Sequence, residues 1–151
     1  MIGCILAKVD LREVLILQTT FDHIMFSQVI EKWKASGTLE LYIFHYYFDF
    51  LHPLFYAFFL ASIMSRAFVK CIYNKRISLV ILLPFIAGVF DIIENLLHLY
   101  MINSGLISEG LVKTSASFTN MKWMIVFLCL LIAFLIHIRN RSVRKQNKIS
   151  F

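Results

Sequence analysis

Three long runs of apolar residues alternate with polar segments along the chain. The runs cover residues 41–64, 77–102 and 121–138. Each is close to the length of about 20 residues with which a helix crosses the hydrocarbon core of a bilayer. Backbone groups inside lipid must be hydrogen-bonded within their own segment, which favours helices. The pattern therefore predicts an all-α fold, a transmembrane helical bundle of three spans within residues 41–138.

The first 40 residues follow a different pattern, which predicts an extracytoplasmic, amphipathic region. Between residues 21 and 35 apolar side chains recur at helical spacing, and polar side chains fill the positions between them. We expect a helix that ends at Gly37 and lies in the outer membrane interface, with Trp33 at the depth of the headgroups. The apolar positions are Phe21, Ile24, Met25, Val29, Ile30 and Trp33.

Two further structures are open for the start of the chain. Residues 11–20 have the length and composition of a second short helix. A fourth, irregular span within residues 1–21 is the alternative, at a cost of about 2.5–3.5 kcal/mol for each charge near its centre. The charged side chains of that segment are Lys8, Asp10, Arg12 and Glu13.

Lysine and arginine cluster in two places that have no acidic neighbour. Four lie between the first two runs, at positions 66, 70, 75 and 76, and five lie in the tail of residues 139–151. We expect residues 103–120, which are rich in serine and threonine, to form a loop, and this loop is nearly free of charge by comparison. By the positive-inside rule, we expect the first loop and the basic tail in the cytoplasm. The N-terminus and residues 103–120 are then outside.

The overall composition agrees with an integral membrane protein. The chain is 60% hydrophobic and 16% charged, with a mean hydropathy of +0.76, whereas about a quarter of the residues in a soluble domain are charged. The net charge of +6 follows from the two basic segments, so we expect no nucleic-acid partner. The lipid bilayer is the expected partner, and a membrane-protein partner or a second copy of the chain is open.

Polar and ionisable side chains occur inside the apolar runs, where they are costly and indicate a functional site. Their spacing places those of the first run on one helical face, and those of the second run on another. These candidate binding residues are His45, Asp49, His52 and Tyr56 in the first run, Asp91, Glu94, Asn95 and His98 in the second, and Lys122 in the third.

The candidate residues predict a polar cavity in the outer half of the membrane, opening to the outside. We expect Asp49, Asp91 and Glu94 to converge there, because they lie at similar depths in their spans. Pro53 adds a polar group, since a proline leaves the carbonyl four residues earlier, that of Asp49, without its donor.

Three alternatives to a binding or catalytic cavity are open. The carboxylates could pair with Lys122 or a histidine and simply lock the bundle, or they could form a proton or ion path. They could also hold a metal, as Glu-x-x-His pairs do in di-metal bundles, although the spacing here differs. The sequence assigns neither a metal nor a cofactor.

Three short segments of the spans carry a family resemblance. Residues 49–56 read as D-x-x-x-P-x-x-Y, residues 91–95 read as D-x-x-E-N, and Lys122-Trp123 opens the last helix. Over residues 20–138 the chain resembles an uncharacterised family of small bacterial multi-pass membrane proteins. The resemblance implies a bacterial plasma membrane and supplies no activity, substrate or cofactor. Members of that family begin with an additional span, so we expect the start of this chain to be shortened or altered.

Three functions follow from these expectations. The first is a multi-pass membrane protein of unassigned activity with a polar, outward-facing intramembrane site. The second is a membrane-embedded enzyme that acts on a lipid, in which the carboxylates and histidines serve as acid–base groups or metal ligands. The third is an accessory or immunity-type membrane protein that acts through helix contacts with a partner.

Overall fold

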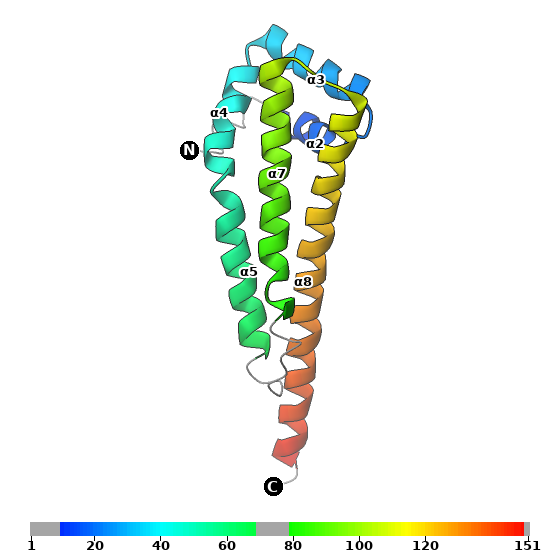
Figure 1. Ribbon diagram of the computed structural model, residues 1–151. Coiled ribbons are helices and arrows are strands. Elements are labelled where there is room, and N and C mark those ends of the chain that lie inside the picture. The colour runs from blue at the N-terminus through cyan, green and yellow to red at the C-terminus, as the bar shows by residue number, and fades with distance from the viewer. Residues whose placement is uncertain (1–9, 69–78, 150–151) are drawn as a thin grey trace.

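The computed structural model describes residues 10–68 and 79–149, with side chains described up to residue 140. This part of the chain is all-helical and contains no strand, which confirms the all-α part of the predicted fold. Figure 1 shows the arrangement of its helices. They are α2 (Leu11–Thr19), α3 (His23–Ser36), α4 (Leu39–Asp49), α5 (His52–Phe68), α7 (Leu83–Ser104) and α8 (Glu109–Ile149).

Two or three of these helices are long and apolar enough to cross a membrane. α7 meets the requirement over its whole length, and α8 meets it over Glu109–Asn140. α4 and α5 are each too short alone and meet it only as a pair, which is bent by 41° at the break between them. These helices identify the chain as a candidate integral membrane protein.

The break between α4 and α5 interrupts the continuous helix that we predicted over residues 41–64. The N–H of Phe50 still bonds the carbonyl of Tyr46, and that of Leu51 bonds the carbonyl of Phe48, at 3.0 Å each. Pro53 has no N–H to continue this ladder, so the helix stops and a new one begins at His52. Pro53 then occupies the first turn of α5, where the missing donor costs little.

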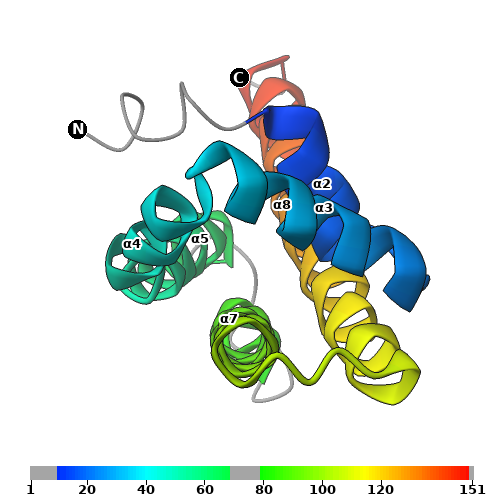
Figure 2. The same cartoon turned by 90° about the horizontal axis from the view of Figure 1, so that it is seen from above.

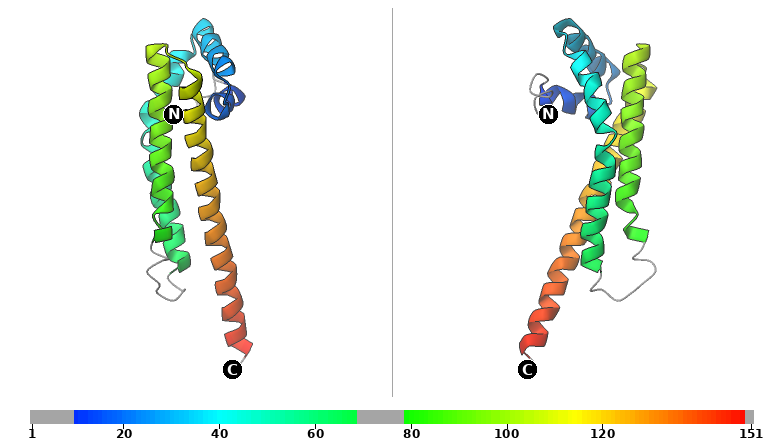
Figure 3. Two further views of the ribbon diagram at one scale, coloured as in Figure 1. Left: turned by 45° about the vertical axis from the view of Figure 1, so that its right-hand side comes forward. Right: turned by 90° about the vertical axis from the view of Figure 1, so that its left-hand side faces the viewer.

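The polar segment before the third span is mostly helical, contrary to the loop expected over residues 103–120. α7 ends at Gly105, whose φ of +70° is the left-handed conformation that glycine adopts easily. α8 begins at Glu109, so only residues 105–108 connect the two helices. At its other end α8 continues past residue 138 into the basic tail and projects beyond α5 and α7 (Figure 3).

α5, α7 and α8 pack along one another and form the bundle (Figures 1 and 2). α7 contacts both of the others, and small residues permit its close approach to α5. A Cβ added at Gly88 would lie 3.4 Å from the carbonyl oxygen of Pro53. This approach brings the polar faces of the helices to the same level of the bundle.

α2 and α3 form a cap over one end of the bundle, with α3 lying across from α4 to α8 (Figure 2). The predicted helix over residues 21–36 is present as α3, but its apolar positions divide between two faces. Phe26, Val29, Ile30 and Trp33 are buried against the bundle. Phe21, Ile24 and Met25 are exposed.

The described start of the chain contains no helix long enough to be a fourth span. α2 occupies the place of the second short helix, and its nine residues rise only about 14 Å. A hydrocarbon core is about 30 Å thick. Residues 1–9, which complete the segment considered for a fourth span, lie outside the described residues.

Candidate functional site

Lys122 lies at the centre of a buried ion cluster between α7 and α8. Its Nζ donates to Oδ1 of Asp91 at 2.8 Å and to Oε2 of Glu94 at 2.7 Å. Asp91 and Glu94 are three residues apart on α7, so both carboxylates face α8. All three side chains are buried, with Glu94 fully removed from the surface. The cluster therefore joins two candidate spans through charged hydrogen bonds.

The polar face of α7 continues from this cluster toward the cap. His98 Nδ1 lies 3.0 Å from the hydroxyl of Tyr46, and that hydroxyl donates to the hydroxyl of Tyr42, also at 3.0 Å. The chain of hydrogen bonds thus links α7 to α4.

Several buried polar atoms next to this chain have no hydrogen-bond partner among the described residues. They include Oε1 of Glu94, Nε2 of His98, both side-chain polar atoms of Asn95 and Oγ of Ser115. An unpaired buried polar group costs about 1–3 kcal/mol. The interior between α7 and α8 is therefore more polar than the stability of a bundle requires.

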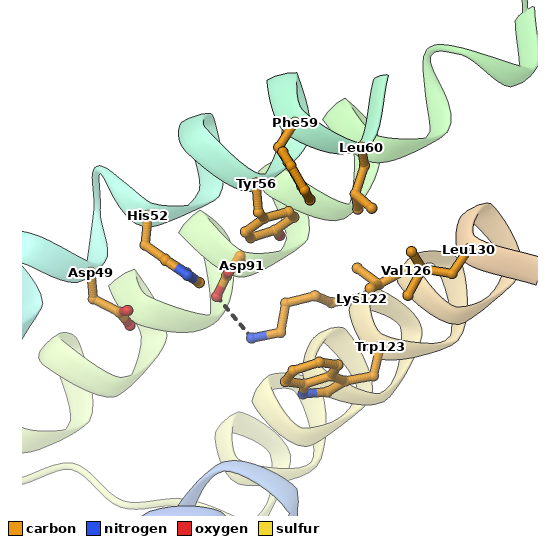
Figure 4. Close-up of a pocket in the computed structure, with 10 residues that line it drawn as sticks. All are labelled: Asp49, His52, Tyr56, Phe59, Leu60, Asp91, Lys122, Trp123, Val126 and Leu130. Atoms are coloured by element: carbon orange, nitrogen blue, oxygen red, sulfur yellow. Dashed lines mark hydrogen bonds and ion pairs between the residues drawn. The ribbon is translucent and has the colours of Figure 1, made fainter. Parts of the chain in front are cut away.

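A cavity of about 350 Å³ lies between α5 and α8 beside the ion cluster. Figure 4 shows Asp49, His52 and Tyr56 facing Asp91 and Lys122 at one end of it. The remainder of the wall is apolar and is formed by Phe59 and Leu60 of α5 and by Trp123, Val126 and Leu130 of α8. We call this cavity the α5–α8 cleft. Its polar end is the end nearer the cap, since both helices run away from the cap.

The predicted site residues do not all reach the cleft. Asp49, His52, Tyr56, Asp91 and Lys122 line it. Glu94 contributes through its bond to Lys122, whereas Asn95 and His98 lie on the same face of α7 nearer the cap. His45 sits behind Asp49, with 3.9 Å between its Nε2 and Oδ1 of the carboxylate.

Three residues of the site were not among the predicted ones, namely two tyrosines of α4 and one tryptophan of α8. Tyr46 contacts His98 and Tyr42 contacts Tyr46, although the sequence pattern singled out the neighbouring His45. Both tyrosines are polar residues in an apolar run at helical spacing from each other, which is the signal that could have found them. Trp123 lines the cleft next to Lys122, and no pattern in the sequence indicated on which side of α8 it lies.

The predicted site was also considered for metal binding. Among residues 10–68 and 79–149, no group of three or more histidine, cysteine, aspartate or glutamate side chains is arranged to hold a metal ion. Between Asp91 and Glu94 the ammonium of Lys122 takes the position that a cation would occupy.

Known proteins give no further information about this site. No family model, curated protein or solved structure shows significant similarity to the chain.

Proposed function

We propose that the chain crosses the membrane three times, through the bent pair α4–α5, through α7 and through α8. The length and apolar character of these helices support the proposal. The lysine and arginine asymmetry supports a cytoplasmic location for the first loop and the tail, with the cap outside. The resemblance noted for residues 20–138 suggests the plasma membrane of a bacterium.

In this orientation the cap lies in the outer membrane interface. Its inner face packs on the bundle, and its outer face presents Phe21, Ile24 and Met25. Exposed apolar side chains next to a polar helix surface are typical of helices that lie among lipid headgroups.

The function that we propose is the binding of an amphiphilic, lipid-like molecule in the α5–α8 cleft. One observation carries the proposal: the cleft has a polar end at Asp49, His52 and Asp91 and an apolar wall from Phe59 to Leu130. The wall includes exposed side chains of both helices, such as Phe59 of α5 and Trp123 of α8, so the cleft opens toward lipid. A molecule with a polar head and an apolar tail would enter sideways from the bilayer.

A purely structural lock explains less of the site. Lys122, Asp91 and Glu94 alone would hold α7 to α8. Asp49 and His52 take no part in that cluster, although each is costly to keep in an apolar run. Their position on the opposite wall of the cleft favours a site that uses both walls.

The test uses Trp123 as a reporter of the cleft. The chain has two tryptophans, so in a Trp33→Phe variant Trp123 is the only one. The protein is placed in nanodiscs of phosphatidylglycerol, a lipid without an ammonium group, and titrated with an uncharged single-chain alcohol that carries bromine on its tail. Binding in the cleft gives quenching that saturates, whereas random contact with lipid gives quenching that rises in proportion to the probe.

A matched pair of variants locates the saturable quenching. Val126→Phe adds bulk inside the cleft and should weaken binding about tenfold or more. Val89→Phe adds the same bulk on the exposed side of α7, away from the cleft, and should leave binding unchanged. Proportional quenching in every variant would show that the cleft holds no such molecule.

A further inference from the structure

The charges around the α5–α8 cleft are unequal, and the inequality points to a particular kind of polar head. Three carboxylates lie in or next to its polar end, those of Asp49, Asp91 and Glu94. One ammonium, that of Lys122, faces them. With neutral histidines, the three carboxylates and the one ammonium have a formal charge of minus two in total.

The one ammonium of the site already pairs with two carboxylates. Lys122 donates to Asp91 and to Glu94 at 2.8 and 2.7 Å, so two of the three carboxylates share its charge. A head with net negative charge would bring further negative charge next to these carboxylates in a region of low dielectric. A head that carries only an anionic group, such as a sulfate or a carboxylate, is therefore disfavoured.

Asp49 is the carboxylate that has no such partner on another helix. Its one ion pair among the described residues is with His45, at 3.9 Å, and that pair is charged only when the histidine is protonated. Asp49 is half-buried and borders the cleft across from Asp91 (Figure 4). A buried charge of this kind is normally stabilised by an opposite charge.

Aromatic rings complete the surroundings of the polar end. Tyr56 and Trp123 line the cleft on opposite helices, and His52 lies beside Tyr56 with 5.4 Å between the ring centroids. The ring of Trp123 lies 5.8 Å from Nζ of Lys122, within the range of cation–π attraction. Carboxylates combined with aromatic faces are the groups that bind ammonium ions in proteins.

We propose that the α5–α8 cleft selects amphiphiles whose head is an ammonium group, held between Asp49 and Asp91 and against the ring of Trp123. This inference rests on the proposed function and specifies its ligand class. The shared chemistry could come from a single-chain amine or from the aminoethyl head of a phospholipid.

The experiment measures competition against the uncharged brominated alcohol in the Trp33→Phe protein. Four competitors with the same tail length are compared: a primary amine, an alcohol, a sulfate, and a phospholipid with an ethanolamine head. We expect the amine to displace the probe at a concentration about tenfold below that of the alcohol, and the sulfate to be weaker still. Displacement by the ethanolamine phospholipid as well would identify a lipid as the source, and its failure would identify a single-chain amine.

A second measurement assigns the selectivity to Asp49. Asp49→Asn should remove the advantage of the amine over the alcohol while the brominated probe still binds, which shows that the fold is intact. Glu40→Gln removes an exposed carboxylate from the same helix, α4, and should change nothing.

The outcomes separate the two proposals. Equal displacement by amine and alcohol, or strongest displacement by the sulfate, would overturn the ammonium proposal and leave lipid binding in place. An unchanged preference for the amine in Asp49→Asn would likewise remove Asp49 from the site. Absence of any saturable probe binding in the parent protein would instead remove the proposed function itself.

Discussion

Lys122 makes two of the buried side-chain hydrogen bonds at the site. Its two hydrogen bonds are charge-assisted and are shielded from solvent, so they are stronger than surface ion pairs. The desolvation of three charged groups opposes this gain. The cluster is therefore sensitive to the loss of any one member, because the remaining charges would be buried without compensation.

We predict that Lys122→Met destabilises the protein by about 3–5 kcal/mol, the usual effect of leaving a buried charge unpaired. Two carboxylates would then lie close together without a cation. Adding Glu94→Gln to the same chain should recover part of the loss, because only Asp91 would remain charged. Thermal or denaturant unfolding in detergent measures both effects.

Lys113→Met is the matched control for this prediction. Lys113 also bonds a glutamate, Glu109 at 2.5 Å, but both side chains are exposed on the surface of α8. An exposed pair contributes about 0–1 kcal/mol, so its loss should change stability little. Additive effects of Lys122→Met and Glu94→Gln would mean that the two side chains do not interact in the folded protein.

One glutamate joins the two helices of the cap. Glu13 of α2 accepts hydrogen bonds from Lys32 and from Nε1 of Trp33, the latter at 2.7 Å, and both donors belong to α3. The bond from Lys32, followed by the bond from Trp33, lowers the pKa of Glu13 below its ordinary value. A lowered pKa means that the charged form of Glu13 stabilises the folded cap.

The stabilisation by Glu13 is complete above the ordinary pKa of a glutamate, about 4.3, and is lost as the pH falls through the lower pKa of the folded cap. In a Trp123→Phe variant Trp33 is the only tryptophan. We predict that its fluorescence changes in a single step at a pH below that ordinary value, as Glu13 is protonated and the indole loses its charged acceptor. Glu13→Gln should abolish the step.

Glu31→Gln controls for the general effect of acid on the cap. Glu31 pairs with Lys34 at 2.8 Å, on the exposed surface of α3 and away from Trp33. Its replacement should leave the acid step of Trp33 unchanged. A step that persists in Glu13→Gln would assign the transition to another group and would contradict the role given to this hydrogen bond.

Helical periodicity predicted most of the helices, but it could not predict which residues of each helix contact the other helices. The predicted helix over residues 21–36 is present as α3, since its apolar and polar positions follow one period. The period does not say which apolar residues face protein and which face the exterior, so Phe26 was missed while Phe21 and Ile24 are exposed. Two amphipathic surfaces on one helix require knowledge of the bundle beneath it.

Local rules also misplaced two boundaries. A proline in an apolar run was expected to free one carbonyl within a continuous helix, but the chain divides into two helices at His52. The polar segment before the third span looked like a loop because it is rich in serine and threonine. Most of it belongs to α8, in which hydroxyls such as those of Thr114 and Ser117 bond carbonyls four residues earlier.

In the candidate site too, the sequence predicted features within one helix but not contacts between helices. One-face spacing on α7 identified Asp91, Glu94, Asn95 and His98, and all four are buried on that face. Contacts between helices depend on rotation and close approach, which no single segment records. The pairing of both carboxylates of α7 with Lys122, and the separation of His45 from the cleft, therefore emerged only in the assembled bundle.

Along the length of the bundle, apolar and polar side chains form three zones. An apolar cluster that includes Phe26, Trp33 and Met101 lies beneath the cap. A second apolar cluster, around Met64 and Cys129, lies toward the opposite end. The polar residues lie between the two. A molecule in the α5–α8 cleft would thus keep its head in the middle zone, beside Lys122. Its tail would extend along α8 to Leu130, which lies about 12 Å from Lys122 along the helix.

The leaflet from which such a molecule enters depends on how the bundle is oriented in the membrane. Single cysteines are introduced for labelling in a chain in which Cys4, Cys71 and Cys129 are replaced by alanine. We predict that a membrane-impermeant maleimide added to intact cells labels Ser108→Cys and Ser36→Cys. It should label Gln146→Cys and Asn74→Cys only after the membrane is permeabilised, because the basic segments are retained inside.

Each pair of positions tests one span. Ser108 and Gln146 flank α8, so opposite labelling means that α8 crosses the membrane once. Ser36 and Asn74 flank the bent pair α4–α5, and labelling of both from outside would make that pair a re-entrant loop instead of a span. Labelling of Gln146→Cys but not Ser108→Cys in intact cells would reverse the orientation. The polar end of the cleft, which is the end nearer the cap, would then face the inner leaflet, and its amphiphile would have to enter from the cytoplasmic side.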